Sequence, residues 1–176
     1  MARCAGLRAF AGFSAALLAI GGCGPGAPAT PRDVRVRVDR IVIDENDAPV
    51  VVLEEEGGTR WLPIWIGRDE ARSIALEIEQ VHPPRPNSHD LARDLIRGLD
   101  AEVARVVVTE LREGTYYALM HVRRGDRTVP IDARPSDAIA IALRAGAPIF
   151  VRESLFSQSH SESPPSEPED APRREI

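Results

Sequence analysis

The stretch from Thr128 to Val151 reads TVPIDARPSDAIAIALRAGAPIFV and contains both kinds of element from which the fold is built. Thr128–Ile131 is typical of a strand, and Pro148–Val151 of a short final strand. Between them Ser136 is placed to cap a helix over Asp137–Arg144. The interior of this helix is apolar on every side, so we expect it to be buried.

The rest of the chain repeats this mixture of strands and helices. We expect strands over Val34–Ile43, Val50–Leu53, Trp61–Ile66, Glu102–Leu111 and Thr115–Arg123, and helices over Asp69–Val81 and His89–Leu99. Short turns join most successive strands. Ser88 is the expected N-cap of the second helix, and Pro63 predicts an edge strand or a bulge. The pattern predicts an α+β fold: a mostly antiparallel mixed sheet with about three helices in a single compact domain.

The composition limits the function. The 176 residues carry a formal net charge of -5, and all 22 basic residues other than histidine are Arg. A net acidic chain is not the usual footprint of a non-specific nucleic-acid binder. The sequence contains no phosphate-loop glycine motif, no Gly-x-Ser-x-Gly motif and no His/Cys group with zinc spacing. These absences exclude the common NTPase and serine-hydrolase classes.

The N-terminus has the order of a bacterial lipoprotein signal. Arg3 and Arg8 precede a short apolar run over Ala9–Ile20, which is too short to span a membrane. Ile20-Gly21-Gly22-Cys23 then resembles a lipobox. The resemblance implies cleavage after residue 22 and lipid attachment to Cys23, with an ordinary signal peptide as the alternative.

These features divide the chain into four parts. Residues 1–22 are the expected signal peptide, 23–32 a flexible tether, 33–156 the folded domain and 157–176 a disordered acidic tail rich in Pro and Ser. A lipid anchor predicts an extracytoplasmic location at the cell envelope, in the periplasm or at the outer membrane, with the protein held on the membrane.

Three motifs resemble one known family. They are Glu54–Gly67 (EEEGGTRWLPIWIG), Pro84–Leu91 (PRPNSHDL) and Ile131–Ala140 (IDARPSDAIA). In this order and spacing they resemble the bifunctional nuclease domain family, also called the DNase-RNase domain family. The resemblance implies an α+β domain that assembles as a homo-oligomer and hydrolyses DNA and RNA.

His89 and Asp90 are the first candidate catalytic residues. Hydrolysis of a phosphodiester needs an activated water, neutralisation of the developing charge and a proton for the leaving oxygen. The pair stands at the start of an expected helix, where Asp90 also favours the helix dipole. The alternative is structural, with Asp90 a first-turn acid and His89 a packed loop residue.

Asp132, Arg134 and Asp137 are the second group of candidates. They join a strand end to a helix N-terminus, a place that binds anions, and Arg134 adds a fork suited to phosphate. Asp132 and Asp137 are the expected ligands if Mg²⁺ or Mn²⁺ takes part. The alternative is a capped helix start in which Arg134 pairs with Asp132.

Other polar and aromatic residues have structural interpretations. Glu70 and Glu77, with Arg72, fit a solvated helix face better than a metal site. The run Glu54–Glu56 fits protection of a sheet edge. Trp61 and Trp65 fit packing in the core or between subunits, with base stacking as the alternative.

The sequence therefore predicts a membrane-tethered nuclease-family protein that cleaves DNA, RNA or both. The alternative is a non-catalytic binding or assembly module of the same fold at the cell envelope. A small-molecule or peptide hydrolase is disfavoured, because no nucleophile motif is present.

Overall fold

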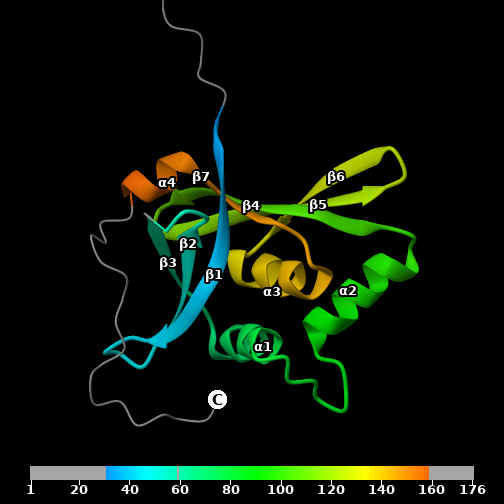
Figure 1. Ribbon diagram of the computed structural model, residues 1–176, viewed down its shortest axis with the longest axis horizontal. Coiled ribbons are helices and arrows are strands. Elements are labelled where there is room, and N and C mark those ends of the chain that lie inside the picture. The colour runs from blue at the N-terminus through cyan, green and yellow to red at the C-terminus, as the bar shows by residue number, and fades with distance from the viewer. Residues whose placement is uncertain (1–30, 59, 159–176) are drawn as a thin grey trace, which may run out of the picture. The chain divides into compact units, whose positions relative to one another are not determined.

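The computed structural model describes residues 31–58 and 60–158, which fold as an α+β domain (Figure 1). The strands are β1 (Asp33–Ile43), β2 (Pro49–Glu55), β3 (Trp61–Trp65), β4 (Glu102–Arg112), β5 (Thr115–Arg124), β6 (Arg127–Ala133) and β7 (Ile149–Arg152). The helices are α1 (Arg68–Ile78), α2 (Ser88–Gly98), α3 (Pro135–Ala145) and the short α4 (Glu153–Gln158). The predicted fold class is confirmed, and α4 is an element that the sequence pattern did not indicate.

The seven strands form one mixed sheet in the order β3-β2-β1-β7-β4-β5-β6. Every neighbouring pair is antiparallel except β4 and β7, which are parallel. The chain leaves β6 at one edge, passes through α3 and returns to the middle of the sheet as β7. Pro63 lies in the other edge strand, β3, as its missing N–H predicts.

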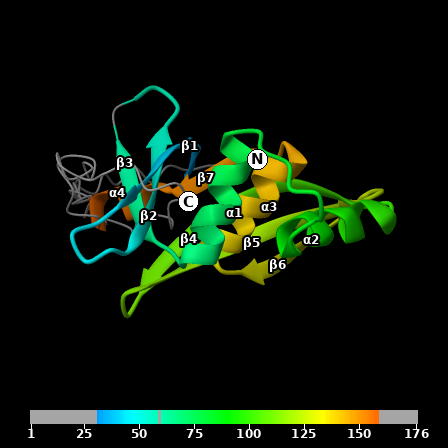
Figure 2. The same ribbon diagram turned by 90° about the horizontal axis from the view of Figure 1, so that it is seen from below.

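Helix α3 is the centre of the helical layer. It packs against β4 and β5, and it also contacts α1 and α2, which flank it when the domain is seen from below (Figure 2). Its apolar side chains from Ala138 to Ala142 are buried in the main core. Burial of this helix, expected from its apolar interior, is confirmed, and it explains why polar groups at both its ends are held in fixed positions.

The caps of two helices differ from the prediction. Asn87, not Ser88, caps α2: its side chain accepts the backbone N–H groups of His89 and Asp90, and Asp90 accepts the Asn87 N–H in return. The predicted cap Ser136 lies inside α3, because that helix already begins at Pro135 with Arg134 as its N-cap residue. Proline suits the first helical position, since its fixed φ is helical and its missing N–H needs no partner there.

The apolar spacing from Ala71 to Ile78 predicts one buried stripe along α1. That expectation is wrong at Ile78, which is 45% exposed, whereas the polar Ser73 is only 5% exposed. Trp65 does not pack in the core of this chain: it is 57% exposed and donates its Nε1–H to Asp44 Oδ2 at 3.0 Å, and its predicted alternative of packing between subunits stays a prediction. Trp61 does pack, against the small cluster of Val residues on β1 and β2.

The acidic run before the hairpin turn forms ion pairs with arginines. Glu54 pairs with Arg37, Glu55 with Arg60, and Glu56 with Arg35.

Several predictions lie outside the described residues: the signal over 1–22, Cys23, most of the tether and the tail from 159 onward. Residues 157 and 158, assigned to that tail, end α4. No helix within residues 31–58 and 60–158 is long and apolar enough to cross a membrane.

Candidate functional site

The N-terminal end of α3 carries an exposed arginine with a bound carboxylate. Arg134 follows β6 directly, and its side chain is 67% exposed. Its Nε donates to Asp137 Oδ2 at 2.6 Å and its Nη2 to Asp137 Oδ1 at 2.9 Å. This paired geometry is among the stronger and more directional ionic contacts in proteins. Arg134 thus pairs with Asp137 in the next turn, not with Asp132.

Helix α1 supplies a second carboxylate to the same guanidinium. Arg134 Nη2 also donates to Glu70 Oε1 at 2.6 Å, and the Glu70 side chain is only 16% exposed. Gly67 makes room for it, since a Cβ there would collide with the Glu70 carboxylate. The interpretation of Glu70 as part of a solvated face is therefore wrong. The carboxylate of Glu77 makes no bond to this group within the described chain.

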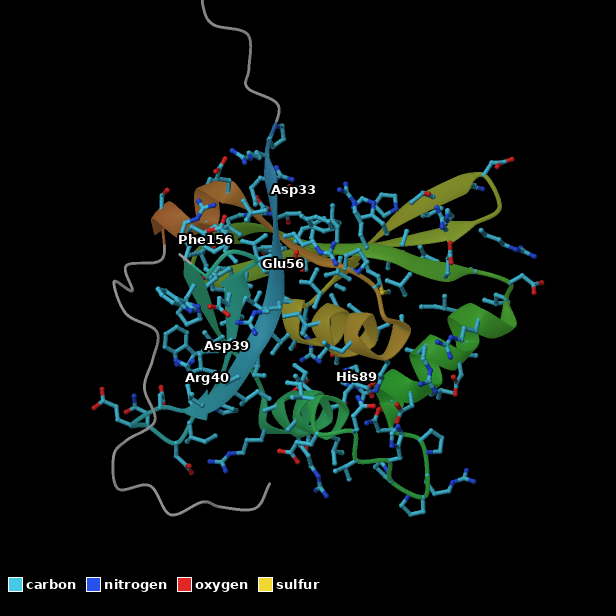
Figure 3. All side chains as sticks on the ribbon, in the orientation of Figure 1. Asp33, Asp39, Arg40, Glu56, His89 and Phe156 are labelled. Atoms are coloured by element: carbon cyan, nitrogen blue, oxygen red, sulfur yellow. The ribbon has the colours of Figure 1, made fainter. Side chains whose placement is uncertain are left out.

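Helix α2 brings His89 into contact with both α1 and α3. Its Nε2 lies 3.1 Å from Asp137 Oδ1 and its Nδ1 lies 2.8 Å from Ser73 Oγ. Figure 3 labels His89 where the beginning of α2 comes beside α3. The two predicted groups of candidates, 48 residues apart in sequence, thus meet in space. We call Glu70, Ser73, His89, Arg134 and Asp137 the polar cluster.

Asp90 points away from the polar cluster into the interior. Its Oδ1 accepts from Arg144 Nε at 2.7 Å, and the Arg144 side chain is 2% exposed. Arg144 also donates to the carbonyls of Ala140 and Ser73. Neighbouring residues on a helix point about 100° apart. His89 therefore reaches the polar cluster, and Asp90 reaches the buried arginine behind it.

Asp132 does not join the polar cluster. It lies on β6 opposite Leu119, while its neighbour Ile131 lies opposite the core residue Met120. Because side chains alternate along a strand, Asp132 faces the side of the sheet away from α3. It makes no side-chain hydrogen bond or ion pair with any residue that the structure describes.

The arrangement does not fit a metal ion held by Asp132 and Asp137. Both oxygens of Asp137 already accept hydrogen bonds from Arg134, and one of them also contacts His89. Over residues 31–58 and 60–158 no group of three or more His, Cys, Asp or Glu side chains is placed to hold a metal. Mg²⁺ and Mn²⁺ favour oxygen ligands, and both oxygens of Asp137 lie against the guanidinium of Arg134.

Both carboxylates near α3 remain ionised well below neutral pH. Partial burial alone would raise the pKa of Asp137, but hydrogen bonds from Arg134 and His89 outweigh it and lower that pKa. Burial alone would also raise the pKa of Asp90. Hydrogen bonds from the Asn87 N–H and from Arg144 outweigh that effect, so the pKa of Asp90 is lowered as well. Asp137 therefore presents a carboxylate, 28% exposed, beside an exposed cation.

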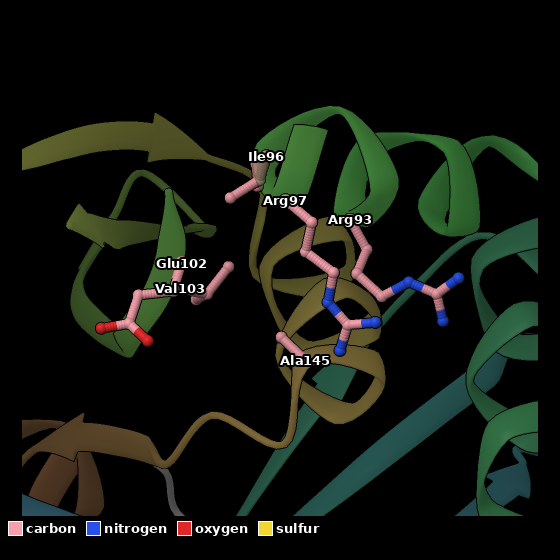
Figure 4. Close-up of a pocket in the computed structure, with 6 residues that line it drawn as sticks. All are labelled: Arg93, Ile96, Arg97, Glu102, Val103 and Ala145. Atoms are coloured by element: carbon pink, nitrogen blue, oxygen red, sulfur yellow. The ribbon is translucent and has the colours of Figure 1, made fainter. Parts of the chain in front are cut away.

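A hollow lies between the later turns of α2, the start of β4 and the end of α3 (Figure 4). Its volume is about 160 Å³, and its lining residues are Arg93, Ile96, Arg97, Glu102, Val103 and Ala145. Arg93 pairs with its neighbour Asp94, and Glu102 pairs with Arg123 on β5. Arg97 has no ion pair within the described chain. No member of the polar cluster lines this hollow.

Sequence reasoning missed three residues that support the polar cluster: Ser73, Asn87 and Arg144. One signal was available for Arg144, since a single charge inside an otherwise apolar helix needs a buried partner. Ser73 and Asn87 carried no such signal. Ser and Asn are common in exposed turns and caps, so nothing local showed that these two side chains point inward.

Comparisons with known proteins identify the relatives of this fold. The bifunctional nuclease domain model matches residues 51–164. The chain is 48% identical over 127 residues to an uncharacterized protein of Mycobacterium tuberculosis, covering 72% of this chain and 75% of that protein. It is 33% identical over 120 residues to bifunctional nuclease 2 of Oryza sativa subsp. japonica, covering 66% of this chain and 37% of the relative.

A third relative is bifunctional nuclease 2 of Arabidopsis thaliana. It is 34% identical over 116 residues, which are 62% of this chain and 35% of the plant protein. The chain thus spans little more than a third of the length of these two plant relatives, which contain further sequence beyond the matched region.

Proposed function

The chain belongs to the bifunctional nuclease domain family, and from that premise we propose that it hydrolyses phosphodiester bonds in DNA, RNA or both. The observation that supports this most directly is the polar cluster at the start of α3. There an exposed arginine and a partly exposed carboxylate stand side by side, backed by a histidine.

Arg134 is the proposed phosphate-binding group. Its Nε and Nη2 are committed to Asp137 and Glu70, and its Nη1 makes no hydrogen bond to either. The two Nη1 protons are therefore available to the oxygens of a phosphate. A fixed cation stabilises the negative charge that develops as a nucleophile attacks phosphorus, because it does not have to reorient during the reaction. Asp137 and Glu70 supply that fixation.

Asp137 is the proposed acceptor for the proton of the attacking water. It is ionised, it is partly exposed, and it lies within hydrogen-bond distance of the arginine that would hold the phosphate. A positioned carboxylate that removes a proton in the transition state is ordinary general-base chemistry. Asp90 and Asp132, proposed from sequence with these residues, do not lie beside Arg134.

The test is cleavage of labelled single- and double-stranded DNA and RNA by the purified chain. We expect Arg134→Ala to lower kcat by about a hundredfold to a thousandfold, the usual cost of one transition-state donor. Arg112→Ala is the matched control, because Arg112 is an exposed arginine paired with Glu110 at the distant β4–β5 turn. Equal activity in both variants, with Mg²⁺, with Mn²⁺ or with EDTA, would refute this site.

Attachment to the membrane is a second part of the proposal. It rests on the order of charged, apolar and small residues before Cys23, which matches a lipoprotein signal. We expect the native chain to fractionate with membranes and to incorporate labelled fatty acid, and Cys23→Ala to lose the label. Fatty-acid incorporation that persists in Cys23→Ala would show that the lipid is attached elsewhere.

An assembly role is the second candidate function, and an exposed apolar surface favours it. Leu91 and Leu95 of α2 and its C-cap residue Leu99 are 54%, 58% and 64% exposed, and Val129 and Ile131 of β6 are 40% and 41% exposed. Grouped apolar side chains of this kind mark contact surfaces. We propose that a second copy of the chain covers them. Light scattering measures the molar mass of the native chain and of Leu95→Glu. An oligomer that dissociates in Leu95→Glu would support this contact, and one that does not dissociate would oppose it.

A further inference from the structure

Ser73 is a buried hydroxyl at the meeting point of all three long helices. Its Oγ lies 2.8 Å from His89 Nδ1, 3.1 Å from Asn87 Nδ2 and 3.0 Å from Arg144 Nη2. The residue is 5% exposed, so water does not compete for these contacts. The proposed reaction assigns no task to this serine.

Two of its three partners are hydrogen-bond donors. An arginine guanidinium has only N–H groups and therefore donates to Ser73. The amide of Asn87 is oriented by the helix cap, since its Oδ1 accepts the backbone N–H of His89 at 2.9 Å and of Asp90 at 3.0 Å. The other end of that amide, its NH₂ group, consequently faces Ser73 and donates to it.

The third contact follows from the capacity of a hydroxyl group. A serine oxygen accepts through two lone pairs and donates one proton. Asn87 and Arg144 occupy both lone pairs, so the Ser73 proton is directed at His89 Nδ1, which accepts it. A neutral imidazole has one N–H. We propose that Ser73 is a positioning residue that holds His89 in the neutral tautomer with its proton on Nε2, donated to Asp137.

This tautomer decides what His89 does at the site. The lone pair of the ring is turned inward to Ser73, and the single N–H is bound to Asp137 Oδ1 at 3.1 Å. His89 therefore does not remove a proton from water, and it orients the Asp137 carboxylate instead. An imidazolium would add a third donor to a Ser73 oxygen that has two lone pairs, so one contact would have to break. The tautomer is independent of the nuclease proposal, whereas its effect on catalysis rests on that proposal.

The direct test is nitrogen NMR of the full chain with labelled histidine at neutral pH. Among the four histidines, His89→Gln identifies the signal. We expect a protonated Nε2 and an unprotonated Nδ1 in the native protein. A protonated Nδ1, two protonated nitrogens or a mixture of tautomers would each overturn the proposal.

Both Ser73 and Asp137 contact the His89 ring, so their effects on its tautomer are separated in an Asp137→Asn background. The Asn amide can either donate a hydrogen bond to the ring or accept one from it, so it does not favour one tautomer. We expect Asp137→Asn to keep the Nε2–H tautomer and the double variant with Ser73→Ala to show both tautomers. Ser73→Thr should restore the single form. Ser136→Ala, which removes another buried hydroxyl, is the matched control and should change nothing. Retention of one tautomer without the Ser73 hydroxyl would overturn the assignment.

A kinetic measurement connects the tautomer to the reaction. Misplacing a reacting group slightly can cost up to about a hundredfold in rate. We expect Ser73→Ala to lower kcat by about tenfold to a hundredfold with KM unchanged, and Ser73→Thr to recover the loss. An unchanged kcat in Ser73→Ala would overturn the positioning role. A chain with no nuclease activity would refute the proposed function, and the NMR result would still decide the tautomer.

Discussion

The two ends of α3 each carry an arginine paired with a carboxylate, and the two pairs differ in their access to water. Arg134 at the N-terminal end has a side chain that is 67% exposed, whereas that of Arg144 at the C-terminal end is 2% exposed. The guanidinium of Arg144 donates hydrogen bonds to Asp90, Ser73 and Ala140. In Arg134, by contrast, the Nη1 nitrogen makes no hydrogen bond to Asp137 or Glu70.

The difference shows how one helix divides structure from chemistry. A buried charge is stable only when every partner is present, so the Arg144 end is expected to determine stability. An exposed ion pair contributes little to stability, and its charge remains available to a ligand. Substitutions at the exposed end should therefore change activity far more than stability, whereas those at the buried end should lower stability.

The largest expected effect on stability is at Arg144. Arg144→Met preserves much of the side-chain volume but leaves the Asp90 carboxylate, whose side chain is 17% exposed, without its cation. We expect the free energy of unfolding to fall by about 3–5 kcal/mol, which is the usual cost of breaking a buried pair. Urea denaturation followed by circular dichroism measures it. A loss below about 1 kcal/mol, typical of a surface pair, would erase the contrast between the two ends of α3.

The next largest effect is expected at the cap of α2, which holds both His89 and Asp90 in place. Asn87→Ala removes the acceptor for two backbone N–H groups and a donor to Ser73. We expect a loss of about 1–2 kcal/mol in the free energy of unfolding, as for other N-cap residues. Ser88→Ala is the control and should stay within about 0.5 kcal/mol. A larger loss in the free energy of unfolding for Ser88→Ala than for Asn87→Ala would mean that Ser88 is the cap.

Acid should weaken the buried end through Asp90. Its pKa is lowered from 3.8 in the folded state. The stabilisation is therefore complete above the pKa of the unfolded chain and is lost as pH falls through the lower folded pKa. We expect unfolding midpoints of the native protein to drop as the pH falls below 3.8. Asp90→Asn should be less stable at neutral pH and show a flatter decline, and an equally steep decline would exclude Asp90 as a source.

The smallest effect on stability is expected at the exposed end. Arg134→Met should change the free energy of unfolding by less than about 1 kcal/mol, because the Arg134 side chain is 67% exposed and an ion pair at an exposed guanidinium contributes little. The same substitution should abolish most of the proposed cleavage. Parallel denaturation and cleavage assays on this variant and on Arg144→Met test the division directly. A strong destabilisation by Arg134→Met would show that both ends are structural.

Much of the fold was predictable because local patterns determined it. Strand alternation, turn residues and the apolar run of α3 placed the strands and long helices nearly where they lie. The errors fell at helix ends and at α4, where side-chain contacts with other elements decide the boundary. Ile78 illustrates this: it has the correct spacing for a buried stripe, but it is the last residue of α1 and is 45% exposed.

The polar cluster was predictable in part. His89, Arg134 and Asp137 were found because their residue types suit phosphate chemistry and stand at helix starts. Their meeting was not predictable, because residues 48 positions apart come together only when α2 and α3 pack. Asp132 shows the converse, since it is close to Arg134 in sequence and faces the other side of the sheet.

The sequence by itself determined the family, the α+β class and the residue types available for chemistry, because these depend on local patterns of polarity and on motifs. Only the tertiary structure decided which arginine is buried, which carboxylate each one binds and which ring nitrogen of His89 contacts Ser73. Those properties depend on the direction of side chains from three separate helices. They are set by the packing of α1, α2 and α3 around one buried serine.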